Sequence, residues 1–126
     1  MSEENLKGSY VLHIEVPEEQ TIRVGGLGPV RFRKGFYAYV GSALGGIDAR
    51  VSRHLREEKK MHWHIDYLLE KAHVLGAVCL PSDVRTECLI AEGFACRLDP
   101  VPGFGCSDCG CRSHLFYSPD LGDLRP

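Results

Sequence analysis

The amino-acid sequence predicts a single small domain of mixed α/β class. Its 126 residues are the size of one ordinary domain. Hydrophobic residues make up 44% of the chain and charged residues 25%, which is the balance of a folded chain rather than a disordered one. Segments rich in β-forming residues are followed by segments whose apolar residues recur at helical spacing. We therefore expect strands and helices that share one core.

β-Branched and aromatic residues, bounded by turn residues, predict six strands. These strands are expected at 9–16, 21–24, 30–32, 36–40, 74–80 and 114–117. Gly41 is expected to end the fourth strand. The second and third are short and are joined by a Gly-rich connection, so we expect them to pair. Residues 17–34 then form a hairpin inserted between two longer strands.

Apolar residues at helical spacing predict three helices. The helices are expected over 47–57, over 64–71 and from Ser82 or Asp83 to Gly93. In the first helix Ile47, Val51 and Leu55 recur every four residues and are expected to face the core. Ser82 or Asp83 would cap the third helix, and Gly93 would end it.

The charge balance limits the mode of nucleic-acid binding. With 15 basic and 17 acidic residues, the formal net charge is -2. The chain therefore lacks the overall positive field that drives non-specific binding to DNA. Any contact with nucleic acid must come from a local basic patch.

The sequence has the character of a soluble, cytoplasmic protein without a membrane partner. No stretch approaches the ~20 apolar residues that span a bilayer, and acidic residues stand where a signal peptide would carry positive charge. Six cysteines are then expected to be reduced. Cys79, Cys88 and Cys96 are widely spaced and are expected to be thiols of the core.

A cluster of four residues near the C-terminus has the ligand types that zinc prefers. The four are Cys106, Cys109, Cys111 and His114. Alternatives are a site shared with His62 or His64, a redox-active thiol pair, or a structural loop of free thiols. The spacing lacks the two separated pairs that mark zinc sites most strongly.

The stretch from Tyr37 to Arg56 contains the side chains that are best suited to catalysis or phosphate binding. The strand ends near Tyr39, a Gly-rich turn follows, and the next helix carries Arg50, Arg53 and His54 on one face. Guanidinium groups match the geometry of phosphate, and a phenol exchanges a proton when a nearby charge lowers its pKa. Surface arginines on a helix are also common without any such role.

These residues resemble the GIY-YIG nuclease superfamily. Gly8-Ser9-Tyr10 stands in the place of the first tripeptide, Tyr39-Val40-Gly41 in the place of the second, and Arg50 matches the arginine of the following helix. More narrowly, the chain resembles an uncharacterised branch that occurs alone or fused to endonuclease III. That likeness rests on the phrases YVGSALGG, RHL, HWHIDYLL, TECLIA and FGCSDCGCRSHLF.

The resemblance implies an α/β (α+β) fold, with a central three-stranded antiparallel sheet flanked by helices. It runs from about Gly8 to Tyr117, so we expect one domain over 8–118. Residues 1–7 and 119–126 are then tails, and 103–118 form a Cys/His-rich segment of the domain. Tyr10 and Tyr39 are much further apart than the two tyrosines of a short hairpin, which the insertion at 17–34 explains.

The resemblance also implies roles for single residues. Activation of water falls on Tyr10 or Tyr39, and stabilisation of the phosphate charge on Arg50. Glu87 would hold one Mg²⁺ or Mn²⁺. His54 and His62 would contact phosphate or relay protons. The remaining phosphate-binding positions are Gly41, Ser42 and Arg53.

The expected function is therefore a metal-dependent endonuclease that hydrolyses phosphodiester bonds in nucleic acid, with DNA as the first candidate. The resemblance connects this activity to DNA repair, with a base-excision repair glycosylase as a partner. The alternative is a non-catalytic module of the same fold that binds nucleic acid or protein. A third hypothesis is a small metal or redox protein organised by the cysteine cluster.

Overall fold

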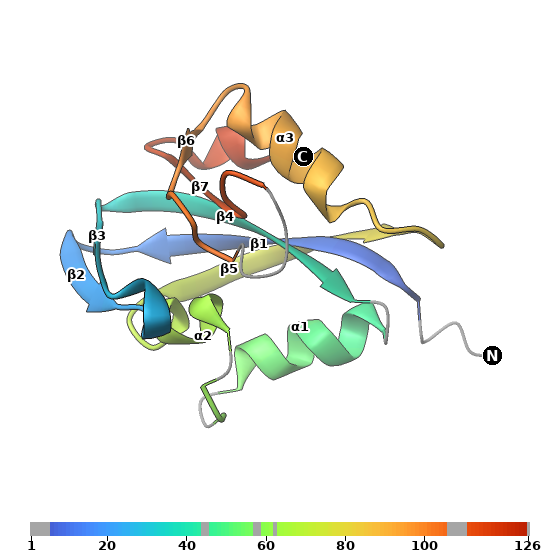
Figure 1. Ribbon diagram of the computed structural model, residues 1–126, viewed down its shortest axis with the longest axis horizontal. Helices are drawn as coiled ribbons and strands as arrows, with labels where there is room; N and C mark the ends of the chain where they lie inside the picture. Colours follow the sequence, from blue (N-terminus) through green and yellow to red (C-terminus); the bar gives the residue numbers. More distant parts are fainter. Residues whose placement is uncertain (1–5, 44–45, 57–58, 62, 106–110, 126) are drawn as a thin grey trace.

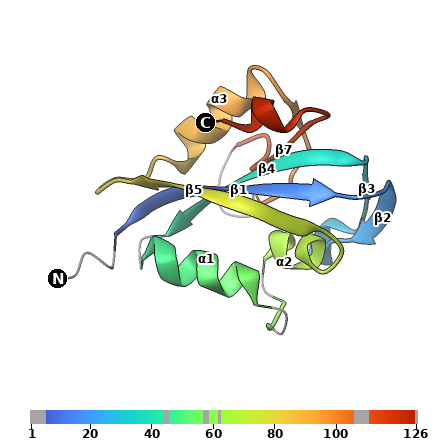
Figure 2. The ribbon, with the colours of Figure 1, turned by 180° about the vertical axis from the view of Figure 1, so that it is seen from behind.

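A single sheet divides the molecule into two helical layers (Figure 1). The computed structural model describes residues 6–43, 46–56, 59–61, 63–105 and 111–125. Helices α1 (Ile47–Leu55) and α2 (His64–Leu69) cover one face, and α3 (Glu87–Ala95) covers the other. Figure 2 shows the same three layers from behind. None of the helices in the described part of the chain has the length and apolar character needed to cross a membrane.

The sheet has five strands in the order β5-β1-β4-β7-β6, and every neighbouring pair is antiparallel. The strands are β1 (Gly8–Val16), β4 (Gly35–Ala43), β5 (His73–Pro81), β6 (Asp99–Pro100) and β7 (Leu115–Ser118). The predicted class, a small α/β (α+β) fold with a central antiparallel sheet flanked by helices, is confirmed. The sheet is wider than the expected three strands because β7 and β6 extend it beyond β4.

Both faces of β1 and β4 are buried, because each face packs on a separate apolar cluster. Alternate residues of a strand point to opposite faces, so Tyr10 and Leu12 pack toward α1 and α2 while Val11 packs toward α3. Leu124 belongs to the second cluster and is fully buried. The short 3-10 helix Leu121–Leu124 therefore packs on the sheet, although the sequence places it in a tail.

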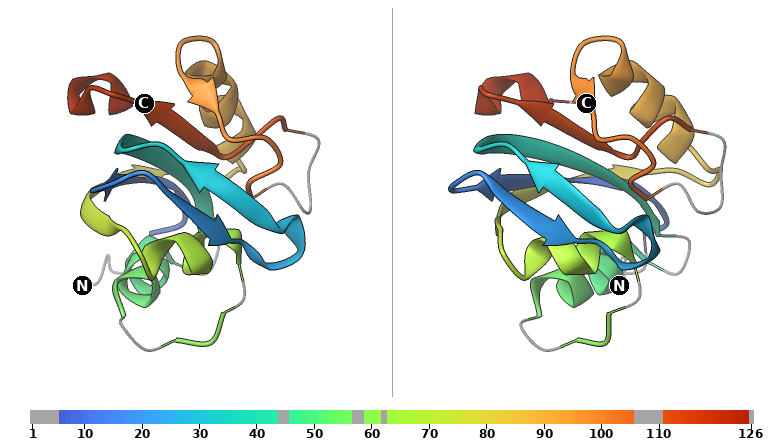
Figure 3. Two further views of the ribbon diagram at one scale, coloured as in Figure 1. Left: turned by 90° about the vertical axis from the view of Figure 1, so that its left-hand side faces the viewer. Right: turned by 60° about the vertical axis from the view of Figure 1, so that its left-hand side comes forward.

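The insertion forms a two-stranded sheet of its own, from β2 (Gln20–Arg23) and β3 (Pro29–Phe32). Figure 3 shows this hairpin beside α2, and Figure 1 shows it at one end of the molecule. Ile22 and Phe32 are buried in the same cluster as Tyr10. The hairpin thus extends the core on the α2 side of the main sheet.

Two boundaries differ by three residues or more from those predicted, the end of β4 and the start of α3. Strand β4 continues through Gly41 to Ala43, because its backbone stays paired with β1 up to Gly8. Helix α3 begins at Glu87 rather than at Ser82 or Asp83, and it runs through Gly93, where a side chain would meet open space.

The apolar face of α1 also differs from the prediction. Ile47 is buried as expected, but Leu55 is 58% exposed and His54 takes the buried place at 2%. The imidazole can be buried because it has a hydrogen-bond partner on the sheet, the hydroxyl of Tyr10. A polar side chain with a partner can replace an aliphatic one in a core.

Candidate active site

The two tripeptide tyrosines lie side by side on the same face of the sheet. Tyr10 is on β1 and Tyr39 on β4, with ring centroids 6.4 Å apart. Tyr10 pairs across the strands with Gly41, and a Cβ at position 41 would lie 2.3 Å from the Tyr10 hydroxyl. The absence of a side chain at Gly41 is therefore what allows the Tyr10 ring to lie flat against β4.

His54 connects the helix α1 to this pair of tyrosines. Its Nε2 lies 2.7 Å from the hydroxyl of Tyr10, and both side chains are almost fully buried. Burial lowers the pKa of His54 to about 4, and burial raises the pKa of the Tyr10 hydroxyl well above its usual range. At neutral pH a neutral imidazole and a protonated phenol therefore share this hydrogen bond. The Nδ1 atom of His54 is buried without a hydrogen-bond partner in the described part of the chain.

Arg50 places a permanent positive charge beside Tyr10. Its Nη1 donates a hydrogen bond of 3.0 Å to the carbonyl of Ser42, and its guanidinium lies 4.6 Å from the centre of the Trp63 ring. Burial raises the pKa of Tyr10, and it outweighs the nearby positive charge of Arg50, which acts to lower that pKa. Strand β4 and Trp63 thus hold one cation next to the phenol.

Glu87, the first residue of α3 in the opposite helical layer, supplies a carboxylate whose charge reaches this site. Its negative charge acts on Tyr10 and Tyr39, where it adds to the rise in the pKa of each. One carboxylate oxygen lies 3.9 Å from Nδ1 of His114. The side chain is 18% exposed, so it remains accessible to solvent. A 2.8 Å hydrogen bond between the hydroxyls of Ser9 and Thr86 holds the start of α3 on β1.

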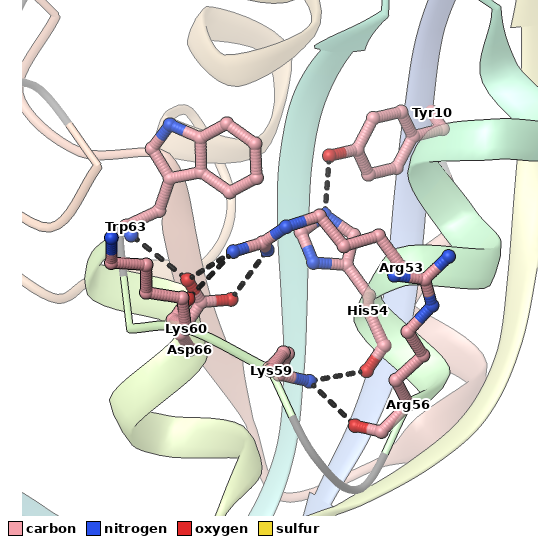
Figure 4. A network of polar contacts seen from close by, with 8 residues as sticks. All are labelled: Tyr10, Arg53, His54, Arg56, Lys59, Lys60, Trp63 and Asp66. Carbon is pink, nitrogen blue, oxygen red and sulfur yellow. Dashed lines mark hydrogen bonds and ion pairs between the residues drawn. The ribbon is translucent and has the colours of Figure 1, made fainter.

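Arg53 is engaged in a different contact, with the fully buried carboxylate of Asp66 (Figure 4). The two guanidinium nitrogens donate to the two carboxylate oxygens at 2.9 and 3.1 Å. Asp66 also accepts a 2.9 Å hydrogen bond from the backbone N–H of Trp63 at the start of α2. Arg53 therefore joins α1 to α2, and Arg50 is the arginine of the two that lies beside the tyrosines.

A second group of potential ligands lies next to Glu87. The donor atoms of Cys88, Cys111 and His114 all lie within 4.8 Å of one another, so this group could hold a metal ion. Cys88 is half-buried and belongs to this group rather than to the apolar core that was predicted for it. The same prediction is wrong for Cys79 and Cys96, which are exposed.

The sequence-predicted residues thus fall into four sets. Tyr10, Tyr39, Arg50 and His54 lie together, supported by Gly41 and Ser42, and the charge of Glu87 acts on both tyrosines. Arg53 pairs with Asp66, and Cys111 and His114 belong to the group with Cys88. His62, Cys106 and Cys109 lie outside the described residues.

Sequence reasoning missed the place of Cys88 in a group of metal ligands, and it assigned no role to Asp66. The only available signal for Cys88 was its place beside Glu87 in the phrase TECLIA, since its partners are far away in the sequence. For Asp66 the signal was its position three residues after Trp63, where a carboxylate can cap a helix.

One comparison with known proteins identifies a family. The family described as "Domain of unknown function DUF123" matches residues 9–125, a span that includes Tyr10, Glu87 and His114. No curated protein and no solved structure matches the chain. The match covers almost the whole chain and every residue of the candidate site. The chain therefore belongs to the DUF123 domain family.

Proposed function

We propose that this protein is a nuclease of GIY-YIG type that hydrolyses phosphodiester bonds in nucleic acid, with a divalent metal ion as cofactor. One observation carries the proposal. The phenol of Tyr10 on β1 lies beside the guanidinium of Arg50 on α1, and the carboxylate of Glu87 on α3 is near enough for its charge to act on both tyrosines. Hydrolysis of a phosphodiester needs these three functions: handling of a proton, stabilisation of phosphate charge and a metal ligand.

Arg50 is the group that would bind the phosphate. A guanidinium pairs well with phosphate oxygens because its N–H donors lie in one plane. The contacts with the Ser42 carbonyl and the Trp63 ring hold the Arg50 side chain in place before substrate binds. Such prior orientation reduces the cost of fixing the side chain during the reaction.

Tyr10 would orient the attacking water through its hydroxyl. Burial keeps the phenol protonated, so its partner His54 is needed as the proton acceptor behind it. An anionic phosphate bound at Arg50 would raise the pKa of His54. As the Tyr10 oxygen takes a proton from the water, the phenol's own proton would pass to Nε2 of His54, which lies 2.7 Å away.

Glu87 is suited to bind the divalent metal ion of the proposed reaction. Its carboxylate offers oxygen ligands and is 18% exposed, so a hydrated ion can reach it. Mg²⁺ and Mn²⁺ prefer oxygen ligands, and Mg²⁺ often binds through one carboxylate with several waters. When bound, the cation supplies polarisation of the phosphate and stabilisation of the leaving oxygen.

The proposal includes the narrower branch that occurs alone or fused to endonuclease III. The antiparallel pairing of Tyr10 with Gly41, which joins the two tripeptides across β1 and β4, supports GIY-YIG membership. DNA as substrate, a base-excision repair glycosylase as partner and a cytoplasmic location follow from that branch as parts of the proposal. The thiols of Cys79 and Cys96 are free, in keeping with a reducing compartment.

Cleavage of end-labelled single-stranded, duplex, flap, junction and RNA substrates tests the proposal. Wild type, Glu87→Gln and the control Glu92→Gln are compared with Mg²⁺, with Mn²⁺ and with a chelator. Glu92 lies on the same helix and is exposed, so its loss should leave activity unchanged. We expect Glu87→Gln to lower the cleavage rate by about 100-fold or more. Equal rates in Glu87→Gln and wild type would remove Glu87 from the site.

A non-catalytic binding module is the alternative, and one observation favours it. Tyr10 and Tyr39 are only 1% and 8% exposed, which limits the access of a substrate to both hydroxyls. Such a module would bind nucleic acid with an affinity that falls with salt, because Arg50 would contact phosphate, and would leave the strand intact. Binding without cleavage on every substrate of the panel would establish this alternative.

A further inference from the structure

We propose that Cys88, Cys111 and His114 bind one zinc ion, at a site distinct from the Mg²⁺ or Mn²⁺ site proposed for Glu87. The ligands come from two segments that lie far apart in the sequence: α3 carries Cys88, and the chain just before β7 carries Cys111 and His114. The ion would link the first turn of α3 to the segment that precedes β7. This inference does not depend on nuclease activity.

The geometry requires only small adjustments of the side chains. The three donor atoms lie within 4.8 Å of one another. In a tetrahedral zinc site, with Zn–S bonds of about 2.3 Å, neighbouring ligand atoms are roughly 3.8 Å apart. Rotation of a cysteine about its Cα–Cβ bond moves its sulfur by more than this difference. The backbone therefore already holds the ligands at a usable spacing.

The donor set selects the metal. Two thiolates and one imidazole favour zinc, whereas Mg²⁺ prefers oxygen ligands. Cys88 and Cys111 are half-buried and His114 is 4% exposed, so the ion would be partly shielded from solvent. Three protein ligands leave one position of the tetrahedron for a water or another group.

His114 is presented from a fixed backbone. Its N–H donates a 2.9 Å hydrogen bond to the carbonyl of Phe104, and its carbonyl accepts one of 2.9 Å from the N–H of Val40. The backbone that carries the imidazole is thus anchored to β4 and to Phe104 before any ion binds. Binding to such a prepared site loses less side-chain freedom.

The site also bears on the proposed catalytic carboxylate. Glu87 precedes Cys88 directly, and one of its carboxylate oxygens lies 3.9 Å from Nδ1 of His114. Carboxylates commonly accept a hydrogen bond from a histidine that binds zinc, and this contact orients the ring. Zinc at Cys88 would therefore limit the movement of Glu87 as well.

Metal content and cobalt binding of the full chain, purified under reducing conditions, test this proposal. We expect one equivalent of zinc in the wild type, and a Co²⁺ spectrum with thiolate charge-transfer bands and the d–d bands of tetrahedral coordination. Cys88→Ser should weaken Co²⁺ binding by at least about 10-fold, since even a hydrogen-bond partner of a ligand is worth that much. Cys79→Ser is the matched control, because Cys79 is exposed on β5.

Alkylation of the wild type keeps the test valid if Cys88→Ser fails to fold. Zinc should protect Cys88 and Cys111 from iodoacetamide, mapped by mass spectrometry, while Cys79 and Cys96 react. Unchanged metal affinity in Cys88→Ser would overturn the proposal in favour of a site within 106–114 alone. A Cys88–Cys111 disulfide, or no metal binding by the reduced chain, would overturn it too. Cleavage is measured separately, so a failure here leaves the nuclease proposal standing.

Discussion

The hydroxyl of Tyr10 and Nε2 of His54 are 2.7 Å apart, although β1 and α1 carry them at positions 44 residues apart. Both side chains are at most 2% exposed. This hydrogen bond joins the last turn of α1 to β1. The helix is therefore held on the sheet by a polar contact as well as by apolar packing. Tyr10 and His54 therefore contribute both to the stability of the fold and to the proposed proton transfer.

Removal of the Tyr10 hydroxyl should destabilise the fold. Tyr10→Phe leaves Nε2 of His54 buried without its partner, which we expect to cost about 1–3 kcal/mol. Urea unfolding measures the loss. Tyr117→Phe is the control, because the Tyr117 hydroxyl donates to the carbonyl of Lys34 in an exposed place and should cost less than about 1 kcal/mol. Equal losses in the two variants would contradict a special role for the buried bond.

The stability of the protein should fall as the pH drops from about 6.5 toward 4. Burial lowers the pKa of His54 from 6.5 to about 4, so the unfolded chain binds more protons in this window and acid favours unfolding. The contribution of His54 is at most about 1.4 kcal/mol per pH unit. Burial also lowers the pKa of His64 and of His114, which adds to the trend.

The variant His54→Gln isolates this effect. The difference in unfolding free energy between wild type and His54→Gln, measured at several pH values, should shrink on acidification below pH 6.5. Glutamine does not titrate, and its amide can still pair with Tyr10. A difference that stays constant with pH would show that His54 is not the titrating group.

An added methyl group at position 41 should disturb the tyrosine pair. The Cβ of Gly41→Ala would lie 2.3 Å from the hydroxyl and from Cζ of Tyr10, which is 1% exposed and has no free space to move into. We expect a loss of about 1–3 kcal/mol or more in thermal or urea unfolding.

Gly93→Ala is the matched control for the variant at position 41. Position 93 lies within α3 and faces open space, so alanine should raise stability by about 0.5–1 kcal/mol. The two substitutions add the same atom and should move stability in opposite directions. A loss in both would mean that α3 does not continue through position 93 as described.

Neutralisation of Asp66 should be costly. Asp66→Asn leaves the guanidinium of Arg53 beside a fully buried amide, and removal of one partner from a buried pair costs about 3–5 kcal/mol. Asp99→Asn breaks an exposed pair with Arg33 and should cost less than about 1 kcal/mol. Denaturant midpoints of the two variants give the comparison, and a similar small cost in both would contradict the structural role of the Arg53–Asp66 pair.

The long strands were predictable because their apolar content is continuous. Strands β1 and β4 are buried on both faces, so the segments 9–16 and 36–40 are rich in β-forming residues throughout. The face of α1 was not predictable from apolar spacing, since the place expected for Leu55 belongs to His54. Only the Tyr10 hydroxyl, far away in sequence, makes that burial favourable.

The candidate site was predictable to the extent that its residues lie within the two tripeptides and the helix that follows them. Tyr39 and Arg50 stand at recognisable spacing, and Tyr10 and Glu87 followed from the resemblance. The metal-binding group could not be predicted from the sequence, because Cys88 comes close to Cys111 only when α3 packs on the sheet. No local rule connects residues of a helix with a distant Cys/His segment.

The position of each strand within the sheet divides the candidate site into a rigid part and an adjustable part. Strand β1 is hydrogen-bonded on both sides, by β4 and β5, so the amides around Tyr10 should exchange with deuterium only when the whole domain opens. Glu87 instead follows the largely exposed segment 81–86, and a local opening of α3 would withdraw the carboxylate while the two tyrosines stay in place. Movement of α3 alone would therefore be enough to bring the Glu87 carboxylate close to the two tyrosines or to take it away from them.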